Sequence, residues 1–501
     1  MPIAMVNARA VQGIRAPLVR IETHLANGLP SFQIVGLPEA AVRESRDRVR
    51  AAIQTSGFEF PRRRITVNLA PADLPKEGGR FDLGIALGIL AASDQVPTTA
   101  LGSREFLGEL GLDGRLRAVG GTLSASLAAR DSGRQLVLSR DDGAEAALAG
   151  DADVVTAEHL LEVCAGLHGK ATLPAAEPPE IHPLPLPDLA DVRGQRQARR
   201  ALEIAAAGGH HLLMIGPPGS GKSMLAARIP GILPPMTDAE ALETAAIHSL
   251  RGSEHLQRNW RCRPFRSPHH TASGVALVGG GSNPRPGEIS LAHNGVLFLD
   301  EMTEFDRRVL DVLREPLETG VIHIARASRQ AEYPARFQLV GAMNPCPQGF
   351  DCDLADRCQC SPEQRARHRR RLSAPLIDRI DIAVEVPRLP TTELVPVPGQ
   401  DEDSATVSER VRQAHARQRE RQGKMNRVLS GRELDLHASL GGGDRVLLER
   451  AVERFRLSAR AYHRILRVAR SIADLDGGRD IGTSHLTEAL GFRALDRWRL
   501  D

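Results

Sequence analysis

The sequence predicts a multi-domain α/β protein with a helical C-terminal domain. The chain has 501 residues, which is more than one typical domain of about 100–200 residues contains. Two proline-rich segments interrupt it, and proline cannot occupy a helix interior or a central strand. Short apolar strand patterns alternate with helical patterns before the second segment, whereas long helical patterns follow it.

These segments divide the chain into successive parts. We expect an N-terminal α/β domain, a linker, a central α/β domain, a second linker and a helical domain. Their respective ranges are 1–172, 173–189, 190–390, 391–404 and 405–501.

Bulk composition indicates a globular chain, because 42% of the residues are hydrophobic and 25% are charged. The net charge of +3 is too small to identify a partner. The N-terminus has no apolar signal region, and the apolar run at Leu83–Ala92 is too short to cross a bilayer. We therefore expect a cytoplasmic protein that has no membrane partner.

A glycine-rich loop gives the strongest signal in the sequence. The apolar strand Leu212–Ile215 leads into GPPGSGKS, and a helical pattern follows. In such a loop, backbone N–H groups bind phosphate oxygens, the lysine reaches the β- and γ-phosphates, and the last serine holds Mg²⁺. We expect ATP and Mg²⁺ as cofactors. The predicted binding residues are Gly216, Pro217, Pro218, Gly219, Ser220, Gly221, Lys222 and Ser223.

Two further strands end in polar side chains suited to hydrolysis. The apolar run 295–301 ends in Asp300 and Glu301, and the run 337–345 carries Asn344 at its tip. Parallel α/β sheets bind ligands at the carboxyl ends of their strands. We expect Asp300 to bind Mg²⁺ through water, Glu301 to polarise the attacking water, and Asn344 to help orient that water.

These motifs together resemble the AAA+ ATPases, and within them the magnesium-chelatase-like branch. The resemblance implies that Asn344 is the residue called sensor 1 and that Arg460 is sensor 2 on a helical lid. It also implies that Arg379, in LSAPLIDRIDI, is an arginine finger that reaches the γ-phosphate of a neighbouring subunit. Such a finger requires a ring, and the branch implies a homo-hexamer. Two alternatives stay open: Arg379 pairing with an adjacent aspartate, and Arg460 being a surface charge.

A closer resemblance covers almost the whole chain. The segments RPFRSPHHTAS and YPARFQLVGAMNPCP resemble the ComM/YifB competence proteins. This implies an ATP-driven DNA motor that promotes branch migration during homologous recombination of transforming DNA, with recombination proteins as further partners. A hairpin at 320–334 would then direct Arg326 and Arg329 towards DNA in a central pore, although an ordinary solvent-exposed hairpin remains an alternative. The alternative functions are a magnesium-chelatase motor subunit and a protein-remodelling ATPase that does not act on DNA.

The N-terminal domain is similar to the catalytic domain of Lon-type proteases and to ribosomal protein S5. Where Lon-like enzymes carry the nucleophilic serine this chain has Arg80, and where they carry the general-base lysine it has Leu123. Serine–lysine chemistry needs a hydroxyl and an amine. We therefore expect a non-catalytic N-terminal domain and no protease activity.

Four of the six cysteines lie within residues 346–360, which suggests a metal site. A chain without a secretion signal is expected to keep its thiols reduced, so a disulfide knot is disfavoured. Four thiolates can enclose a structural Zn²⁺, which would stiffen the loop between Asn344 and Arg379. The spacing does not match paired C-x2-C motifs, so four reduced thiols and a catalytic thiol stay open as alternatives. The candidate ligands are Cys346, Cys352, Cys358 and Cys360.

Overall fold

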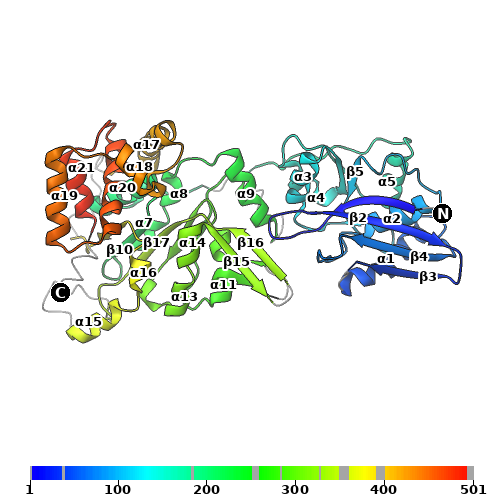
Figure 1. Cartoon of the computed structure of the whole chain (residues 1–501), viewed down its shortest axis with the longest axis horizontal. Coiled ribbons are helices and arrows are strands. Elements are labelled where there is room, and N and C mark those ends of the chain that lie inside the picture. Colours follow the sequence, from blue (N-terminus) through cyan, green and yellow to red (C-terminus); the bar gives the residue numbers. More distant parts are fainter. Residues whose placement is uncertain are drawn as a thin grey trace. The chain divides into compact units, whose positions relative to one another are not determined.

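The structure is a computed structural model that describes residues 3–36, 40–181, 185–250, 259–281, 285–326, 329–348, 360–390 and 401–493. The chain forms two compact units, whose elements are labelled in Figure 1. Unit 1 consists of Met1–Pro183 and Asp238–Trp260, and unit 2 of Leu184–Thr237 and Arg261–Asp501. Among the helices in these described ranges, none is long and apolar enough to cross a membrane.

Unit 1 is built on a seven-stranded mixed sheet. Its strands, in sheet order, are β3 (Ser31–Val35), β4 (Arg64–Ala70), β2 (Leu18–Ala26), β1 (Ile3–Arg9), β5 (Arg104–Phe106), β8 (Gln135–Ser139) and β9 (Val154–Ala157). Every second residue of β1 and β2 is buried, as expected when one face of a sheet covers the core. The helices of this unit's N-terminal part are α1 (Ala40–Thr55), α2 (Asp82–Ala92), α3 (Thr122–Asp131), α4 (Arg140–Ala147) and α5 (Leu160–Leu167).

Unit 1 also contains α9 (Asp238–Ser249), a helix from the middle of the sequence. Its Ala245 and Ala246 form a small apolar cluster with Leu123 of α3 and with Leu148 and Ala149. The sequence-based division placed this segment in the central domain. It packs in unit 1 because its small side chains allow α9 to lie close to α3. The chain therefore passes between the two units three times.

Unit 2 is built on a five-stranded parallel sheet. In sheet order its strands are β11 (Phe265–Arg266), β14 (Val296–Leu299), β17 (Gln338–Met343), β10 (Leu212–Ile215) and β18 (Ile382–Glu385). All residues of β10, β14 and β17 are buried, which explains their continuous apolar sequences. The three strands predicted from these apolar runs are confirmed. Because β17 lies between β10 and β14, the polar residues that follow these strands meet at one edge of the sheet.

Unit 2 also contains nine α-helices that precede the C-terminal region within the residues that the structure describes. They are α6 (Arg196–Gly208), α7 (Lys222–Ala226), α8 (Ile229–Ile232), α11 (Gly274–Val278), α12 (Glu288–Leu291), α13 (Arg307–Asp311), α14 (Arg314–Thr319), α15 (Pro362–Arg369) and α16 (Ala374–Ile377). Two short hairpins also belong to unit 2. Their strands are β12 (Gly279–Gly280) with β13 (Arg285–Pro286), and β15 (Val321–Arg326) with β16 (Arg329–Pro334).

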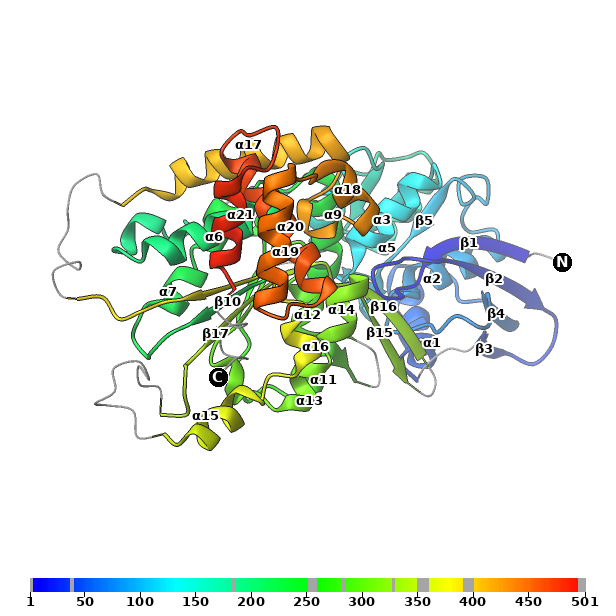
Figure 2. The ribbon, with the colours of Figure 1, turned by 60° about the vertical axis from the view of Figure 1, so that its left-hand side comes forward.

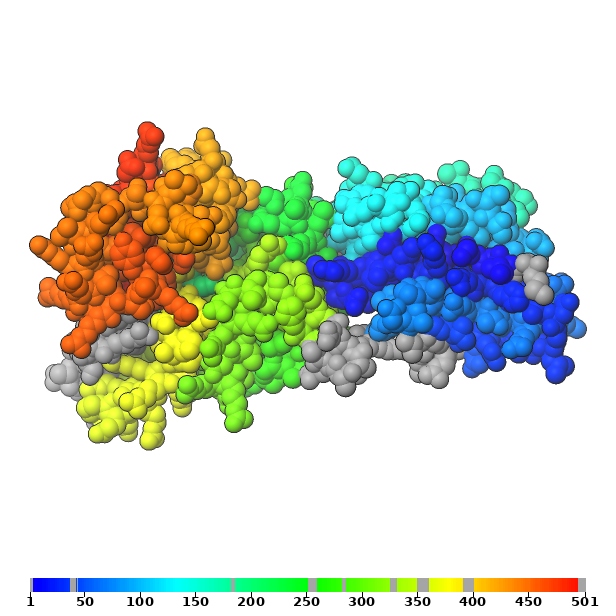
Figure 3. Space-filling view, in the orientation of Figure 1, coloured from blue at the N-terminus to red at the C-terminus, as the bar shows by residue number. Residues whose placement is uncertain are grey.

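The C-terminal region is helical, as predicted. Its helices α17 and α20 pack on α6, which itself contacts the sheet (Figure 2). These helices and the sheet share one hydrophobic core, so the region belongs to the same compact unit as the sheet. The space-filling view shows the orange-to-red C-terminal helices as one packed group (Figure 3). They are α17 (Ser404–Gln422), α18 (Gly431–His437), α19 (Gly442–Arg454), α20 (Ala459–Leu475) and α21 (Thr483–Gly491).

A buried polar cluster connects the start of β10 with this helical region. His210 Nε2 lies 2.8 Å from Ser471 Oγ of α20, and the His211 backbone N–H donates to Asp381 Oδ2 at 3.1 Å. His211 Nδ1 accepts a hydrogen bond of 3.0 Å from the Leu339 N–H. Burial, reinforced by the positive charge of Arg427, lowers the pKa of His211 from 6.5 to about 3.

We predict that this histidine makes unit 2 sensitive to acid. Because the pKa is lower in the folded state, protonation favours unfolding, and stability is lost as the pH falls from 6.5 towards 3. At about 1.4 kcal/mol per pKa unit, the loss between pH 7 and pH 5 is about 2 kcal/mol. His211→Asn keeps an acceptor for the Leu339 N–H but cannot titrate in this range. Urea unfolding followed by circular dichroism should therefore show a shallower pH dependence in the variant, and parallel pH profiles would contradict the prediction.

Candidate active site

The glycine-rich loop has the backbone geometry that a phosphate-binding loop requires. Gly221 has φ = +94°, a left-handed conformation that side chains disfavour. A Cβ on Gly216 would lie 2.1 Å from the Val386 carbonyl oxygen, so no side chain fits there. The Gly216 N–H donates to the Met343 carbonyl oxygen at 3.2 Å and joins the loop to β17. The loop therefore lies against the ends of β17 and β18, the two strands that flank β10.

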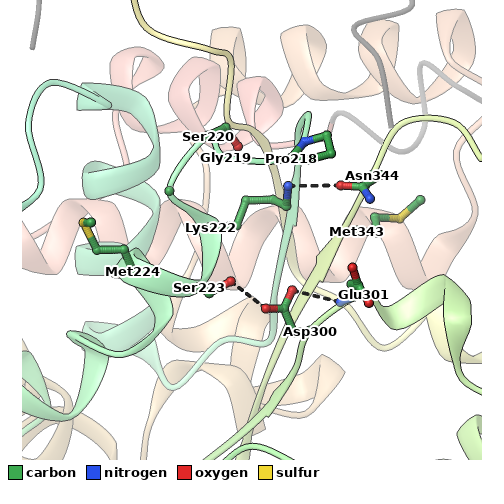
Figure 4. Close-up of a pocket in the computed structure, with 11 residues that line it drawn as sticks. Pro218, Gly219, Ser220, Lys222, Ser223, Met224, Asp300, Glu301, Met343 and Asn344 are labelled. Carbon is green, nitrogen blue, oxygen red and sulfur yellow. Dashed lines mark hydrogen bonds between the residues drawn. The ribbon is translucent and has the colours of Figure 1, made fainter. Parts of the chain in front are cut away.

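A pocket of about 390 Å³ opens beside this loop (Figure 4). This volume is within the range of small-ligand sites, about 300–1,000 Å³. The loop, the turn after β14 and the end of β17 contribute residues to its wall. The lining residues are Pro218, Gly219, Ser220, Gly221, Lys222, Ser223, Met224, Asp300, Glu301, Met343 and Asn344.

Lys222 supplies the positive charge of the pocket. Its Nζ donates to the carbonyl oxygens of Gly216 at 2.7 Å and Pro217 at 2.9 Å, and to Asn344 Oδ1 at 3.2 Å (Figure 4). Burial lowers the pKa of Lys222, whereas the nearby Asp300 and Glu301 carboxylates oppose that shift. The structure thus brings the predicted lysine and the predicted water-orienting asparagine into direct contact.

Ser223 and Asp300 form an oxygen pair on the opposite side of the pocket. Ser223 Oγ donates to Asp300 Oδ2 at 2.5 Å (Figure 4). Hydroxyl and carboxylate oxygens are hard ligands of the kind that Mg²⁺ prefers. The donor set therefore fits Mg²⁺, and direct binding by Ser223 with binding through water by Asp300 stays a prediction.

Glu301 follows directly and has an uncommon backbone conformation for a residue with a side chain, with φ = +48°. Its N–H donates to Asp300 Oδ1 at 2.9 Å, which fixes the turn after β14. Its half-exposed carboxylate lies 3.2 Å from Nδ1 of His270, a residue that the sequence did not single out. The pocket thus combines a cation, an oxygen pair for a metal ion and a carboxylate that can act on water.

Models of the magnesium-chelatase family match three parts of the chain. "Magnesium chelatase, subunit ChlI" matches residues 188–394, "Subunit ChlI of Mg-chelatase" residues 21–142, and "Magnesium chelatase, subunit ChlI C-terminal" residues 401–493. The competence protein ComM of Haemophilus influenzae is 52% identical over 503 residues, which cover 99% of this chain and 98% of ComM. The protein YifB of Salmonella typhimurium is 51% identical over 499 residues, covering 99% and 98% of the two chains.

The chain belongs to the ComM/YifB family of magnesium-chelatase-like proteins. A more distant relative is the magnesium-chelatase 38 kDa subunit of Cereibacter sphaeroides. It is 25% identical over 336 residues, which cover 62% of this chain and 91% of that subunit. Membership of this family indicates ATPase activity with ATP and Mg²⁺ as cofactors.

Two arginines predicted from the resemblance to magnesium-chelatase-like AAA+ ATPases do not line the pocket. Arg379, just after α16, donates to the Pro375 carbonyl oxygen and pairs with Glu318 at the end of α14. It therefore has an intrachain carboxylate partner, Glu318. Arg460 is exposed in the first turn of α20. Their roles as arginine finger and sensor 2 stay predictions.

Arg464, one turn further along α20, contacts the backbone on both sides of Arg379 and was not predicted from sequence. Its Nη1 donates to the carbonyl oxygens of Ile377 at 3.2 Å and Ile380 at 2.8 Å. The buried face of α20 gave a usable signal, because an arginine at a helix position that faces the core needs polar partners. Helix α20 is therefore attached to the segment that carries Arg379.

The hairpin predicted to face DNA is observed as β15–β16. Arg326 and Arg329 are directly paired in its register, at the last pair that the structure describes. Their side chains lie outside the described residues, so their contact with DNA stays a prediction.

The cysteine cluster is described only in part. Cys346 and Cys360 are buried, whereas Cys352 and Cys358 lie outside the described residues. Within the ranges that the structure describes, no group of three or more histidine, cysteine, aspartate or glutamate side chains is placed to hold a metal ion. The zinc site stays a prediction.

In unit 1, the two residues that the predicted resemblance to Lon-type proteases places at the nucleophile and base positions, Arg80 and Leu123, are buried and make structural contacts. The buried Arg80 guanidinium donates to the carbonyl oxygens of Val119 at 3.0 Å and Gly120 at 2.7 Å. Its burial lowers its pKa to about 10. Leu123 is fully buried in the cluster with α9. Both side chains therefore stabilise the fold of unit 1.

Proposed function

We propose that this chain is an ATP-hydrolysing, ring-forming motor that drives branch migration of DNA during recombination of transforming DNA. The observation that supports hydrolysis is the meeting of Lys222, Ser223, Asp300, Glu301 and Asn344 around one pocket. The DNA substrate rests on the likeness to the competence protein ComM. A chelatase motor subunit and a protein-remodelling ATPase are the alternatives, because they would need the same pocket.

Each residue of the pocket has a distinct task in hydrolysis. Lys222 neutralises the negative charge of the β- and γ-phosphates, and Ser223 and Asp300 hold the metal ion. Bound Mg²⁺ supplies further positive charge to the phosphate oxygens. Glu301 accepts a hydrogen bond from the attacking water, and Asn344 orients that water through its side-chain amide. The proton of the water moves towards Glu301 as the bond from the water oxygen to the γ-phosphorus forms and the bond from that phosphorus to the β–γ bridging oxygen breaks, so that ADP leaves.

Oligomerisation completes the site in this proposal. Arg379 would leave Glu318 and bind the γ-phosphate held by a neighbouring subunit in a hexamer. Arg326 and Arg329, at the end of the β15–β16 hairpin, would bind DNA phosphates in the central pore. Hydrolysis at successive interfaces would then move the DNA.

The test compares ATP hydrolysis with and without a four-way-junction DNA, together with migration of a labelled junction. We expect the junction to stimulate turnover several-fold. Glu301→Gln should lower kcat by roughly 10²–10³-fold and stop migration, because the amide is a far poorer acceptor for the proton of the attacking water. ATP affinity should stay within about threefold, since Glu301 acts on water rather than on the phosphates.

Glu304→Gln is the matched control. The Glu304 carboxylate pairs with Arg371 at 2.8 Å and does not line the pocket, so turnover should not change. A rate of ATP hydrolysis that no tested DNA changes would contradict the DNA-motor proposal and favour the chelatase or protein-remodelling alternatives. Salt-sensitive DNA binding is the second discriminating measurement, because phosphate contacts weaken as salt rises.

A further inference from the structure

The Glu301 carboxylate contacts a histidine from a different strand–helix connection. His270 Nδ1 lies 3.2 Å from Glu301 Oε2, and the two side chains are 33% and 52% exposed. The two atoms are within ion-pair distance, and a carboxylate oxygen can act here only as an acceptor. The contact therefore involves only one of the two carboxylate oxygens, Oε2.

Local contacts fix the position of His270. It lies in the loop that follows β11, and β11 pairs in parallel with β14, the strand that leads to Glu301. The His269 ring packs on the His270 ring with centroids 4.1 Å apart. His269 Nδ1 lies 2.8 Å from Thr271 Oγ1, and the Ala272 N–H donates to the His269 carbonyl oxygen at 2.9 Å. The turn therefore presents the His270 ring at one orientation.

Both ends of this loop are attached to helices that lie in the sequence between the glycine-rich loop and β14. Arg266, at the end of β11, makes a two-pronged contact with Glu288 of α12, at 2.6 and 2.9 Å. Ser273 caps α11 by accepting a hydrogen bond of 3.2 Å from the Ala276 N–H. Since α11 and α12 pack on each other, the two ends of the loop are attached to one packed pair of helices.

We propose that His270 is a positioning residue for ATP hydrolysis and sets the orientation of the Glu301 carboxylate. The inference rests on the proposed ATP hydrolysis and adds a residue to its machinery. A half-exposed glutamate has several rotatable bonds, and ordering it only when water binds would cost side-chain entropy in every turnover. By holding Oε2, His270 orders the carboxylate in advance and leaves its second oxygen to accept from the attacking water.

The test is a pair of substitutions at His270. His270→Ala should lower kcat about tenfold, and KM for ATP and the Kd of a fluorescent ATP analogue should stay within about twofold, because the phosphates are not contacted. His270→Asn places an amide N–H group near the position of Nδ1 and can donate to Glu301, so it should recover most of the lost kcat. A structural role would not produce this recovery.

A double-variant comparison locates the effect at Glu301. In the Glu301→Gln background, His270→Ala should cause no further loss in kcat, because the group that His270 orients has been removed. His437→Ala, at the end of α18, is the matched histidine control and should keep wild-type turnover.

The outcomes separate this inference from the proposed function. If the wild type hydrolyses ATP and Glu301→Gln does not, a kcat of His270→Ala equal to or above the wild-type value overturns the positioning role and leaves the ATPase proposal intact. A loss that Asn fails to recover, accompanied by a lower melting temperature, also overturns it. If the wild type itself neither binds nor hydrolyses ATP, both proposals fall.

Discussion

Lys222→Ala is expected to weaken ATP binding by at least about 100-fold and to remove measurable turnover. The side chain is the cation that lines the pocket beside the glycine-rich loop, and it is nearly buried. A charge-assisted contact to phosphate in such a partly desolvated site contributes roughly 3 kcal/mol or more, which corresponds to about 100-fold in affinity. Equilibrium titration with a fluorescent ATP analogue measures the loss directly.

Lys424→Ala is the control, because it removes a lysine that does not line the pocket. Lys424 pairs with Glu433 at 2.6 Å, and both side chains are more than one-third exposed. Such a pair contributes little to stability and lies apart from the pocket, so affinity and turnover should not change. A Lys222→Ala variant that is folded and binds the analogue with wild-type affinity would show that the nucleotide binds elsewhere.

The residues of this pocket could be predicted because their signals are local. A short apolar run predicts a buried strand, and the polar residue after the run lies at the strand's carboxyl end. For Lys222, Asp300 and Asn344 this reasoning needed no knowledge of distant parts of the chain. The contact between Lys222 and Asn344 at 3.2 Å agrees with the placement of their strands side by side.

The partners that were missed depend on contacts between distant segments. His270 lies in an insertion without strand or helix periodicity, and its contact with Glu301 follows only from the pairing of β11 with β14. The alanine-rich sequence of α9 shows that the helix has a small buried face but not which unit that face covers. The helical periodicity of α20 indicates that Arg464 faces the core and needs polar partners, but no sequence motif identifies those partners, which are backbone carbonyl groups.

Arg379→Ala is expected to lower kcat by roughly 10³-fold or more without unfolding the protein. Arginine fingers contribute about 10³-fold or more to phosphoryl transfer by stabilising charge on the γ-phosphate. Within its own chain Arg379 pairs with Glu318, whose side chain is 58% exposed. Such a partly solvated ion pair contributes about 0–1 kcal/mol, so loss of the intrachain contact accounts for little. ATPase assays and thermal melting, measured together, distinguish the two effects.

Mixing two inactive variants tests whether Arg379 acts on a neighbouring subunit. An Arg379→Ala subunit keeps an intact pocket, and a Lys222→Ala subunit keeps an intact arginine. In a randomly mixed equimolar ring, about a quarter of the interfaces combine both intact parts, so up to about a quarter of wild-type turnover should return. Glu318→Gln weakens the intrachain pair but retains Arg379, and it should keep wild-type turnover. Two results together would contradict the finger: mixed rings that form but regain no activity, and a Glu318→Gln variant as impaired as Arg379→Ala. The arginine would then act through Glu318 within its own chain, because a finger that acts on a neighbouring subunit needs only its own guanidinium.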